Sequence, residues 1–288
     1  MCIRDRYIGG AAIENAVGID ADSFGNFVIV GYTASNNFPT TAGSYQAAYA
    51  GGSSYGDAFL IKFNSTGTRL WATYFGGTSD EEGLGIAIDD NDNINICGDT
   101  YSANLPVTTA CSYKTTFGGA EDNYMAKFDD NGNYICSTYI GGAAAADDEI
   151  NYSGTIASYG GFVYVVGITA GQYPITPGAY KTTYGGGTRD GFVMQLCGNA
   201  CGKNTLSVAQ SADETHICTG TPVNYTGSSV SCDTTGTTWS WIFSGATPST
   251  ASTTNPSGII YNTPGSYQVK LVVNTPCGKD SVVSNNYI

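Results

Sequence analysis

The sequence is poor in positive charge, in histidine and in long apolar runs. It has 11 Lys and Arg residues against 24 Asp and Glu, a formal net charge of −13. We expect no nucleic-acid partner, because phosphate contacts need a basic surface. His216 is the one histidine of the sequence, which argues against a Ser-His-Asp triad and against a zinc site with several histidine ligands. No apolar run approaches the roughly 18 residues of a membrane-spanning helix.

Charged residues make up only 12% of the chain, so the helix formers Lys, Glu and Arg are scarce as well. In their place stand 39 Gly and 21 Tyr residues, with many Thr, Ser and Asn. Glycine and short polar residues suit tight turns, whereas tyrosine and threonine favour strands. The composition therefore predicts an all-β protein of many short strands.

A repeat is visible from an aromatic-x-Gly-Gly motif that begins at Tyr7, Tyr74 and Tyr139. Three further motifs keep the same register: Gly31-Tyr32-Thr33, Gly98-Asp99-Thr100 and Gly167-Ile168-Thr169; Phe38-Pro39-Thr40, Leu105-Pro106-Val107 and Tyr173-Pro174-Ile175; Asp57-Ala58-Phe59, Asp122-Asn123-Tyr124 and Asp190-Gly191-Phe192. Four motifs in register indicate three copies of one unit, at residues 7–73, 74–138 and 139–197.

Each copy is predicted to hold two hairpins. In the second copy we expect strands at 85–89, 94–100, 123–128 and 134–140, joined in pairs by Asp, Asn and Gly turns. Four antiparallel strands per unit are typical of a β-propeller blade, and such sheets depend on stacked neighbours. The prediction is a partial β-propeller of three four-stranded blades.

Three blades are too few to close a ring, which takes about four to eight. We therefore expect the remaining blades on the same parent chain; an open three-blade array completed by another chain is the alternative. Residues 1–6 fit neither the repeat nor an export signal, and we interpret them as non-native read-through.

After a linker at 198–203, residues 204–288 are predicted to form a small β-sandwich. Strand patterns occur at 222–225, 239–243, 258–261 and 266–273. Tyr267, Val269, Leu271 and Val273 alternate with polar residues, so one face of that strand should be buried. Several short strands in about 85 residues are typical of an Ig-like sandwich.

The motifs of residues 7–197 resemble those of the SBBP family of bacterial β-propeller repeats. Residues 204–288 resemble a PKD domain, through Gly220-Thr221-Pro222, Trp239-Ser240-Trp241 and Tyr261-Asn262-Thr263-Pro264-Gly265. In that family the last strand normally runs on beyond the position of Tyr287-Ile288, so the resemblance implies truncation at the C-terminus. The pairing resembles Bacteroidetes secreted and surface proteins of the type IX pathway. The resemblance implies an extracellular or outer-surface location, with the export signal lost by truncation. It also implies scaffolding, adhesion or glycan contact, and no reaction.

Three loops rich in Asp and Asn are candidates for calcium, and the richest comprises Asp89, Asp90, Asn91, Asp92 and Asn93. Calcium takes six to eight oxygen ligands, and an EF-hand loop ends in a bidentate Glu that this loop lacks. The alternative is a hairpin turn in which Asp and Asn bond the local backbone. No other cofactor is expected.

Nine cysteines are many for a reducing compartment and favour disulfides. We predict a Cys232–Cys277 disulfide between two loops of the sandwich. A second disulfide in the linker could join Cys201 to either Cys197 or Cys218. The alternative of buried thiols applies to Cys97 and Cys136, which lie in apolar strands.

Acidic clusters follow each Gly-Gly motif, at Glu14, Asp80-Glu81-Glu82 and Asp147-Asp148-Glu149. Paired carboxylates can hydrolyse a glycosidic bond, but one cluster per repeat favours a structural role. Tyrosines near the loops fit either sugar stacking or packing between blades: Tyr32, Tyr45, Tyr49, Tyr113 and Tyr180.

The sequence thus predicts a non-catalytic extracellular scaffold or adhesion segment that contacts a surface polysaccharide or a protein, without spanning a membrane. The alternative is an accessory region of a larger secreted hydrolase or protease. Fold-level analogy carries most of this expectation, and a fold does not fix a function.

Overall fold

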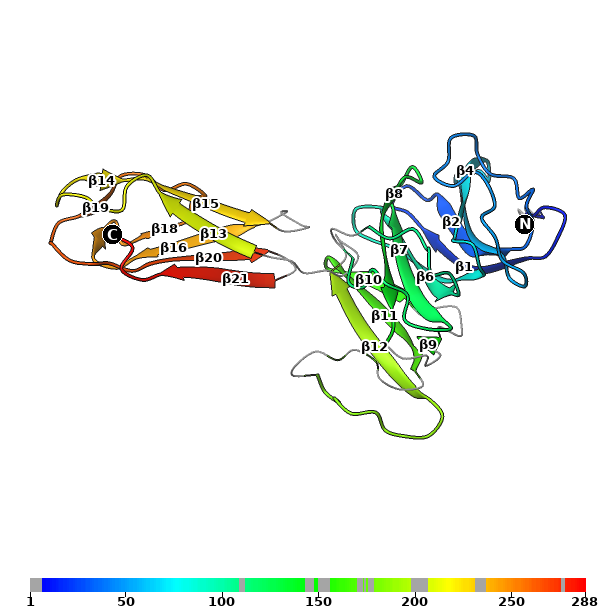
Figure 1. The fold of residues 1–288 in the computed structure, drawn as a ribbon. Helices are drawn as coiled ribbons and strands as arrows, with labels where there is room; N and C mark the ends of the chain where they lie inside the picture. The colour runs from blue at the N-terminus through cyan, green and yellow to red at the C-terminus, as the bar shows by residue number, and fades with distance from the viewer. Residues whose placement is uncertain are drawn as a thin grey trace. The chain divides into compact units, whose positions relative to one another are not determined.

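The computed structural model describes residues 7–108, 112–142, 148–149, 156–169, 173, 175, 179–197, 207–230, 237–275 and 278–288. These residues form strands and turns, and no helix is found among them, so the all-β prediction is confirmed. A search of the same residues for a helix able to cross a membrane finds none. The chain divides into two compact units, Met1–Lys203 and Asn204–Ile288 (Figure 1).

The first unit opens with two sheets of the same design, each a four-stranded antiparallel meander. The first sheet comprises β1 (Glu14–Ala21), β2 (Phe27–Thr33), β3 (Asp57–Phe63) and β4 (Arg69–Phe75). The second comprises β5 (Glu81–Ile88), β6 (Ile94–Thr100), β7 (Asp122–Phe128) and β8 (Tyr134–Ile140). Both first strands shift register at one position, between Ala16 and Gly18 and between Gly83 and Gly85. The predicted strands of the second repeat are confirmed, with β5 beginning earlier than expected.

The third sheet departs from this design. It comprises β9 (Asp148–Glu149), β10 (Ile156–Tyr159), β11 (Phe162–Thr169) and β12 (Asp190–Cys197). Both β9 and β10 pair with β11, so two short segments share the position of the first strand. Within the described residues, β12 pairs with β11 alone. The fourth-strand position is not filled there, because the repeat pattern ends after Cys197 and the chain continues toward the second unit.

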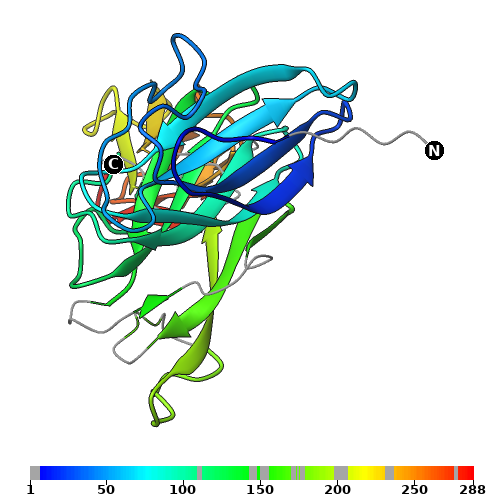
Figure 2. The ribbon, with the colours of Figure 1, turned by 90° about the vertical axis from the view of Figure 1, so that its right-hand side faces the viewer.

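The sheets of the first unit stack face to face (Figure 2). Val28 and Leu60 of the first sheet share a buried apolar cluster with Ile96 of the second. On the other face of the second sheet, Met125 packs in a cluster with Val163. The sheets approach through their first strands, β1 to β5 and β5 to β10. This is the arrangement of blades about a propeller axis.

The second unit is a sandwich of short strands. Its strands are β13 (Ser207–Ala212), β14 (Pro222–Val223), β15 (Tyr225–Val230), β16 (Thr238–Phe243), β17 (Ala246–Thr247), β18 (Thr250–Ala251), β19 (Ile259–Tyr261), β20 (Val269–Thr275) and β21 (Gly278–Ser284). The largest sheet has the order β18-β16-β20-β21. Trp241 of β16 and Leu271 of β20 are fully buried in one core, which confirms the predicted alternation. Across that core the hydroxyls of Tyr225 and Tyr261 lie 2.9 Å apart.

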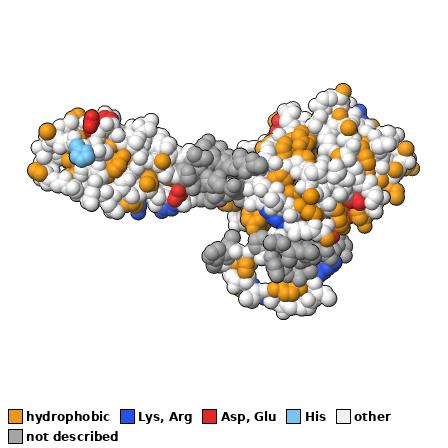
Figure 3. Space-filling model, viewed as in Figure 1, with side chains coloured by type: hydrophobic (Ala, Val, Ile, Leu, Met, Phe, Trp, Pro, Cys, Tyr) orange, Lys and Arg blue, Asp and Glu red, His pale blue; other side chains and the backbone are white. Residues whose placement is uncertain are grey.

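The surface of both units reflects the low charge content of the sequence. On the face seen in Figure 3, Asp, Glu, Lys and Arg side chains are sparse, and hydrophobic side chains are scattered among uncharged polar ones. Specific recognition on such a surface therefore depends on aromatic and uncharged polar groups more than on charge.

Candidate functional site

The calcium-candidate loop, residues 89–93, connects β5 to β6 as a tight turn. Asp89 Oδ1 accepts hydrogen bonds from the N–H groups of Asn91 and Asn93, each at 2.9 Å. Asp89 Oδ2 lies 2.6 Å from the Nζ of Lys127, which is itself buried. Both oxygens are therefore already engaged by the protein.

The other acidic groups of the loop point to different partners. Asp92 adopts a positive φ of 60° and accepts hydrogen bonds from the N–H and Oγ of Ser23, at 2.8 and 2.7 Å. Asp90 and Asn91 are exposed. Throughout the described residues, no group of three or more His, Cys, Asp or Glu side chains is placed to hold a metal. These contacts are those of turn chemistry, and calcium binding at residues 89–93 stays a prediction.

The same kind of turn connects the two strands of each hairpin in the first two sheets. Asp22 Oδ1 accepts from the N–H of Asn26 at 2.8 Å, and Asp129 Oδ1 accepts from the N–H of Asn133 at 2.8 Å. Asn64 takes the equivalent role between β3 and β4. Asp and Asn side chains stabilise such turns by bonding backbone N–H groups two to four residues on.

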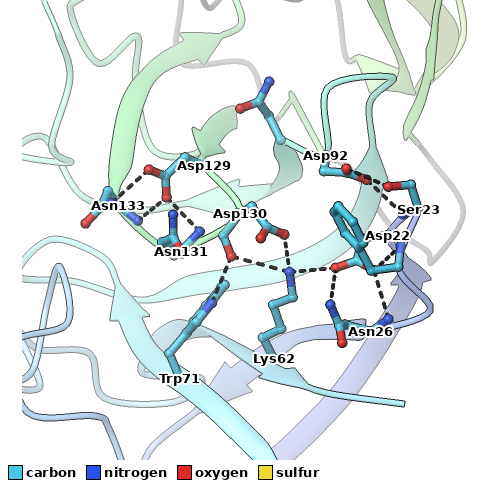
Figure 4. A network of polar contacts seen from close by, with 12 residues as sticks. Asp22, Ser23, Asn26, Lys62, Trp71, Asp92, Asp129, Asp130, Asn131 and Asn133 are labelled. Carbon is cyan, nitrogen blue, oxygen red and sulfur yellow. Dashed lines mark hydrogen bonds and ion pairs between the residues drawn. The ribbon is translucent and has the colours of Figure 1, made fainter.

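These turns also join the first two sheets through Lys62 of β3 (Figure 4). The Lys62 Nζ lies 2.7 Å from Asp22 Oδ2 in its own sheet and pairs with Asp130 in the second sheet. The indole N–H of Trp71 donates to the Asp130 carbonyl at 3.1 Å. Burial alone would raise the pKa of Asp22, but Lys62 and Asn26 lower it to about 2. Burial alone would lower the pKa of Lys62, but the hydrogen bonds that its ammonium donates to Asp130 and Asp22 outweigh burial and raise it.

We predict that Lys62→Met lowers the free energy of unfolding of residues 1–203 at pH 7. The substitution leaves Asp22 buried without its cation, and breaking such a pair costs about 3–5 kcal/mol. Gln195→Met is the matched control, since Gln195 holds the same position in β12 and is exposed. It should change the free energy by no more than about 0.5 kcal/mol in urea unfolding. Equal effects of the two substitutions would show that the Lys62 bridge does not stabilise the sheets.

A buried carboxylate layer lies at the opposite end of the strands. The hydroxyl of Thr100 donates to Glu81 Oε1 at 2.7 Å, and that of Thr33 to Glu14 Oε1 at 2.9 Å. Glu81 is fully buried. A Cβ at Gly76 would collide with Glu81 and lie 3.0 Å from Asp57, so the Gly-Gly motif makes room for these carboxylates. Glu14 and Glu81 of the first two acidic clusters are therefore structural.

One position in this layer differs between the sheets. In the second sheet Lys114 Nζ pairs with Asp122 at 3.1 Å. In the first sheet the equivalent Gln46 donates to Asp57 Oδ2 at 2.9 Å without supplying a charge. Burial raises the pKa of Asp57 to about 7. Burial, with the nearby Asp57, also raises the pKa of Glu81 to about 7.

These shifts predict how stability depends on pH. A carboxyl whose pKa is raised by folding stabilises the folded state below its ordinary pKa, and this contribution is lost as pH rises through the folded value. Asp57 and Glu81 should therefore lower the stability of residues 1–203 as pH rises from about 4 to about 7 or 8. Asp22 has a lowered pKa, so its contribution to stability is present above about pH 4 and is lost as pH falls toward about 2.

Gln46→Lys should raise the melting temperature at pH 8, where Asp57 is ionised and gains a counter-charge. At pH 4 the same substitution should give no gain, because Asp57 is then protonated. The reciprocal Lys114→Gln should destabilise the second sheet at pH 8. Thermal unfolding at the two pH values measures both variants. An identical effect of Gln46→Lys at both values would contradict the assignment of Asp57.

Some of the tyrosines near the loops pack against other side chains, and others are exposed to solvent. Tyr45 stacks on Tyr134 of the second sheet at 4.6 Å, and Tyr49 contacts Tyr74 edge-on at 5.9 Å. Tyr113 packs on the cluster between the second and third sheets. These three tyrosines pack between or within sheets, whereas Tyr180 is fully exposed.

A tyrosine patch, defined as Tyr32, Tyr55, Tyr101, Glu82 and Glu121, lies where loops of the first and second sheets meet. The rings of Tyr32 and Tyr55 contact edge to face at 5.5 Å. Tyr55 and Tyr101 are partly exposed, and the pKa of each is raised. The negative charge of Glu82 is the largest cause of the raised pKa of Tyr55. The pKa of Tyr101 is raised mainly by burial and then by the charge of Glu121.

Asp80 fixes the backbone that carries two of these rings. Its Oδ1 accepts hydrogen bonds from the N–H groups of residues 53–56, including that of Tyr55 at 2.9 Å. Its carbonyl accepts from the N–H of Tyr101 at 3.0 Å. Tyr55, Tyr101 and Glu121 were not predicted from the sequence. The available signal was Asp80, which follows the Gly-Gly motif and anchors both loops.

The cysteines only partly follow the predictions. Cys136 is disulfide-bonded, so the expectation of a thiol there is wrong: burial in an apolar strand does not exclude a second sulfur nearby. Cys97 is buried as expected. Cys218 is an exposed free thiol, which rules out the Cys201–Cys218 alternative. Cys232 and Cys277 lie outside the described residues, as do Asp147 and residues 1–6.

Comparison with known proteins identifies two segments. Residues 70–106, from β4 through β6, match the family model of a beta-propeller repeat. Residues 204–288, the whole second unit, match the family model of the PKD domain. No curated protein matches the chain. Both families are non-catalytic domain types typical of extracellular proteins. The chain therefore combines a segment that matches a beta-propeller repeat with a unit that matches a PKD domain.

Proposed function

We propose that this chain is a non-catalytic scaffold and adhesion segment at a bacterial cell surface, and that it contacts surface polysaccharide through the tyrosine patch. The stacked sheets supply a rigid platform, and the PKD domain serves as a spacer or a weak binding module. The matched families are consistent with an extracellular role. The disulfide at Cys136 fits an oxidising compartment.

The observation that carries the proposal is the chemistry of the patch. Tyr55 and Tyr101 present partly exposed rings, whose faces can stack on the apolar face of a sugar. Glu82, which lies close enough to shift the pKa of both tyrosines, can accept hydrogen bonds from sugar hydroxyls, whereas Glu121 is buried and already hydrogen-bonded to Tyr101. Asp80 already holds the loops of Tyr55 and Tyr101 in place, so binding a ligand costs little conformational entropy in these loops.

Binding of the full chain to immobilised bacterial surface polysaccharides tests the proposal. We expect Tyr55→Ala and Tyr101→Ala each to weaken binding by about tenfold, as loss of a central aromatic anchor does. Tyr180→Ala is the control, since Tyr180 is fully exposed and lies outside the patch. Binding that is equally strong in all three variants would overturn the assignment to the patch. Absence of polysaccharide binding by the unaltered chain would overturn the proposed ligand.

A further inference from the structure

The third sheet carries an apolar face that lies open. The register pairs Val166 of β11 with Val193 of β12, so their side chains share one face. Val166 is 42% exposed and Val193 73% exposed. Tyr159 of β10, which pairs with Phe162 of β11, is exposed as well. Exposed valines in neighbouring strands are unusual for a surface without a partner.

The equivalent positions of the other two sheets are fully buried. Val166 corresponds to Val30 in the first sheet, and Val193 corresponds to Leu60 there and to Met125 in the second sheet. All three equivalents have no exposed surface. In the first sheet, Val30 and Leu60 are covered by Ile96 and Ala126 of the second sheet. The repeat thus buries this face by stacking another sheet on it.

The complementary half of such a junction is only partly open on the first sheet, because Ile61, at the position of Ala126, is buried in that sheet's own cluster. A Cβ at Gly18 would lie 3.0 Å from Val30 and 3.1 Å from Ile86, so Val30 of one sheet and Ile86 of the next lie side by side. The position of Ile86 in the first sheet is held by Ile19, which is 64% exposed. The third sheet therefore presents a face equivalent to that of the first sheet in the existing junction. The first sheet presents a face equivalent to that of the second sheet.

The charges of the junction are absent from both open faces. Between the first two sheets, Lys62 pairs with Asp130, and Ser23 donates to Asp92. On the third sheet, the position of Lys62 is held by the exposed Gln195. On the first sheet, the positions of Asp130 and Asp92 are held by Ser65 and Gly25. A junction of these two faces would bury neither an unpaired lysine nor an unpaired carboxylate. Its one charge at an equivalent position is Arg69, which holds on the first sheet the place of Tyr134.

We propose that residues 1–288 associate with a second copy of the same chain, with the third sheet of each copy stacked on the first sheet of the other. The two contacts are related by a twofold axis, so the assembly closes instead of growing into a fibre. Six sheets would then surround one axis, within the range of propellers. Among the described strands, none pairs with the edge of β12 that faces away from β11; that edge would receive the partner's Tyr7-Ile8 segment, which matches the end of the fourth strands β4 and β8.

The mass of the full chain in solution, measured by sedimentation from about 1 to about 200 μM, tests the proposal; this range spans typical dimer affinities. We expect a species of twice the 29.9 kDa chain mass. Val193→Lys should weaken the dimer by about a hundredfold or more, since it buries an unpaired charge. Ile242→Lys is the control, because Ile242 is an exposed apolar residue of the second unit. A monomer throughout the range, or a dimer insensitive to Val193→Lys, would overturn the proposal.

A crosslink distinguishes the proposed geometry from other dimers. In a Cys218→Ser background, Ile19→Cys combined with Val166→Cys should form disulfide-linked dimers under mild oxidation, because these positions correspond to the adjacent Ile86 and Val30. Chains carrying only one of the two cysteines should not crosslink in this way. A dimer in which the double variant fails to crosslink would overturn the stacking of third sheet on first.

Discussion

The burial of apolar side chains between stacked sheets is the constraint on which the first unit depends. Strands β2, β3, β6 and β7 carry apolar residues on both faces, so no single sheet can cover its own surface. Val30 and Leu60 are buried only because the second sheet lies on them. Each sheet therefore contributes to the stability of its neighbour, as in other repeat proteins.

Polar groups set the orientation in which the sheets stack. Lys62 connects Asp22 in its own sheet to Asp130 in the next, and Ser23 bonds Asp92 across the same junction. Apolar contacts are not directional, whereas these polar pairs are satisfied in one arrangement only. The same arrangement places the loops of Tyr55 and Tyr101 together, so the candidate binding surface is a consequence of stacking.

Much of this fold follows from the sequence, because periodic motifs and turn residues report local structure. The repeat, the strands of its second copy and the alternation of Val269, Leu271 and Val273 were predictable in this way. The tyrosine patch was not, because its residues come from loops of two sheets. Lys62 and Asp130 are 68 residues apart, and no local signal fixes the register between sheets. Cys136 shows the same limit, since an apolar strand pattern does not reveal a bonded sulfur.

Native-state hydrogen exchange of the full chain tests most directly whether the sheets are stabilised by one another. If stacking is the main source of their stability, the slowest amides of β2 and β3 should open with the same free energy as those of β6 and β7, within about 1 kcal/mol. Separation of either sheet exposes both halves of the shared cluster. Amides of β2 and β3 that open several kcal/mol more easily than those of β6 and β7 would contradict the account, because the second sheet would then persist without the first.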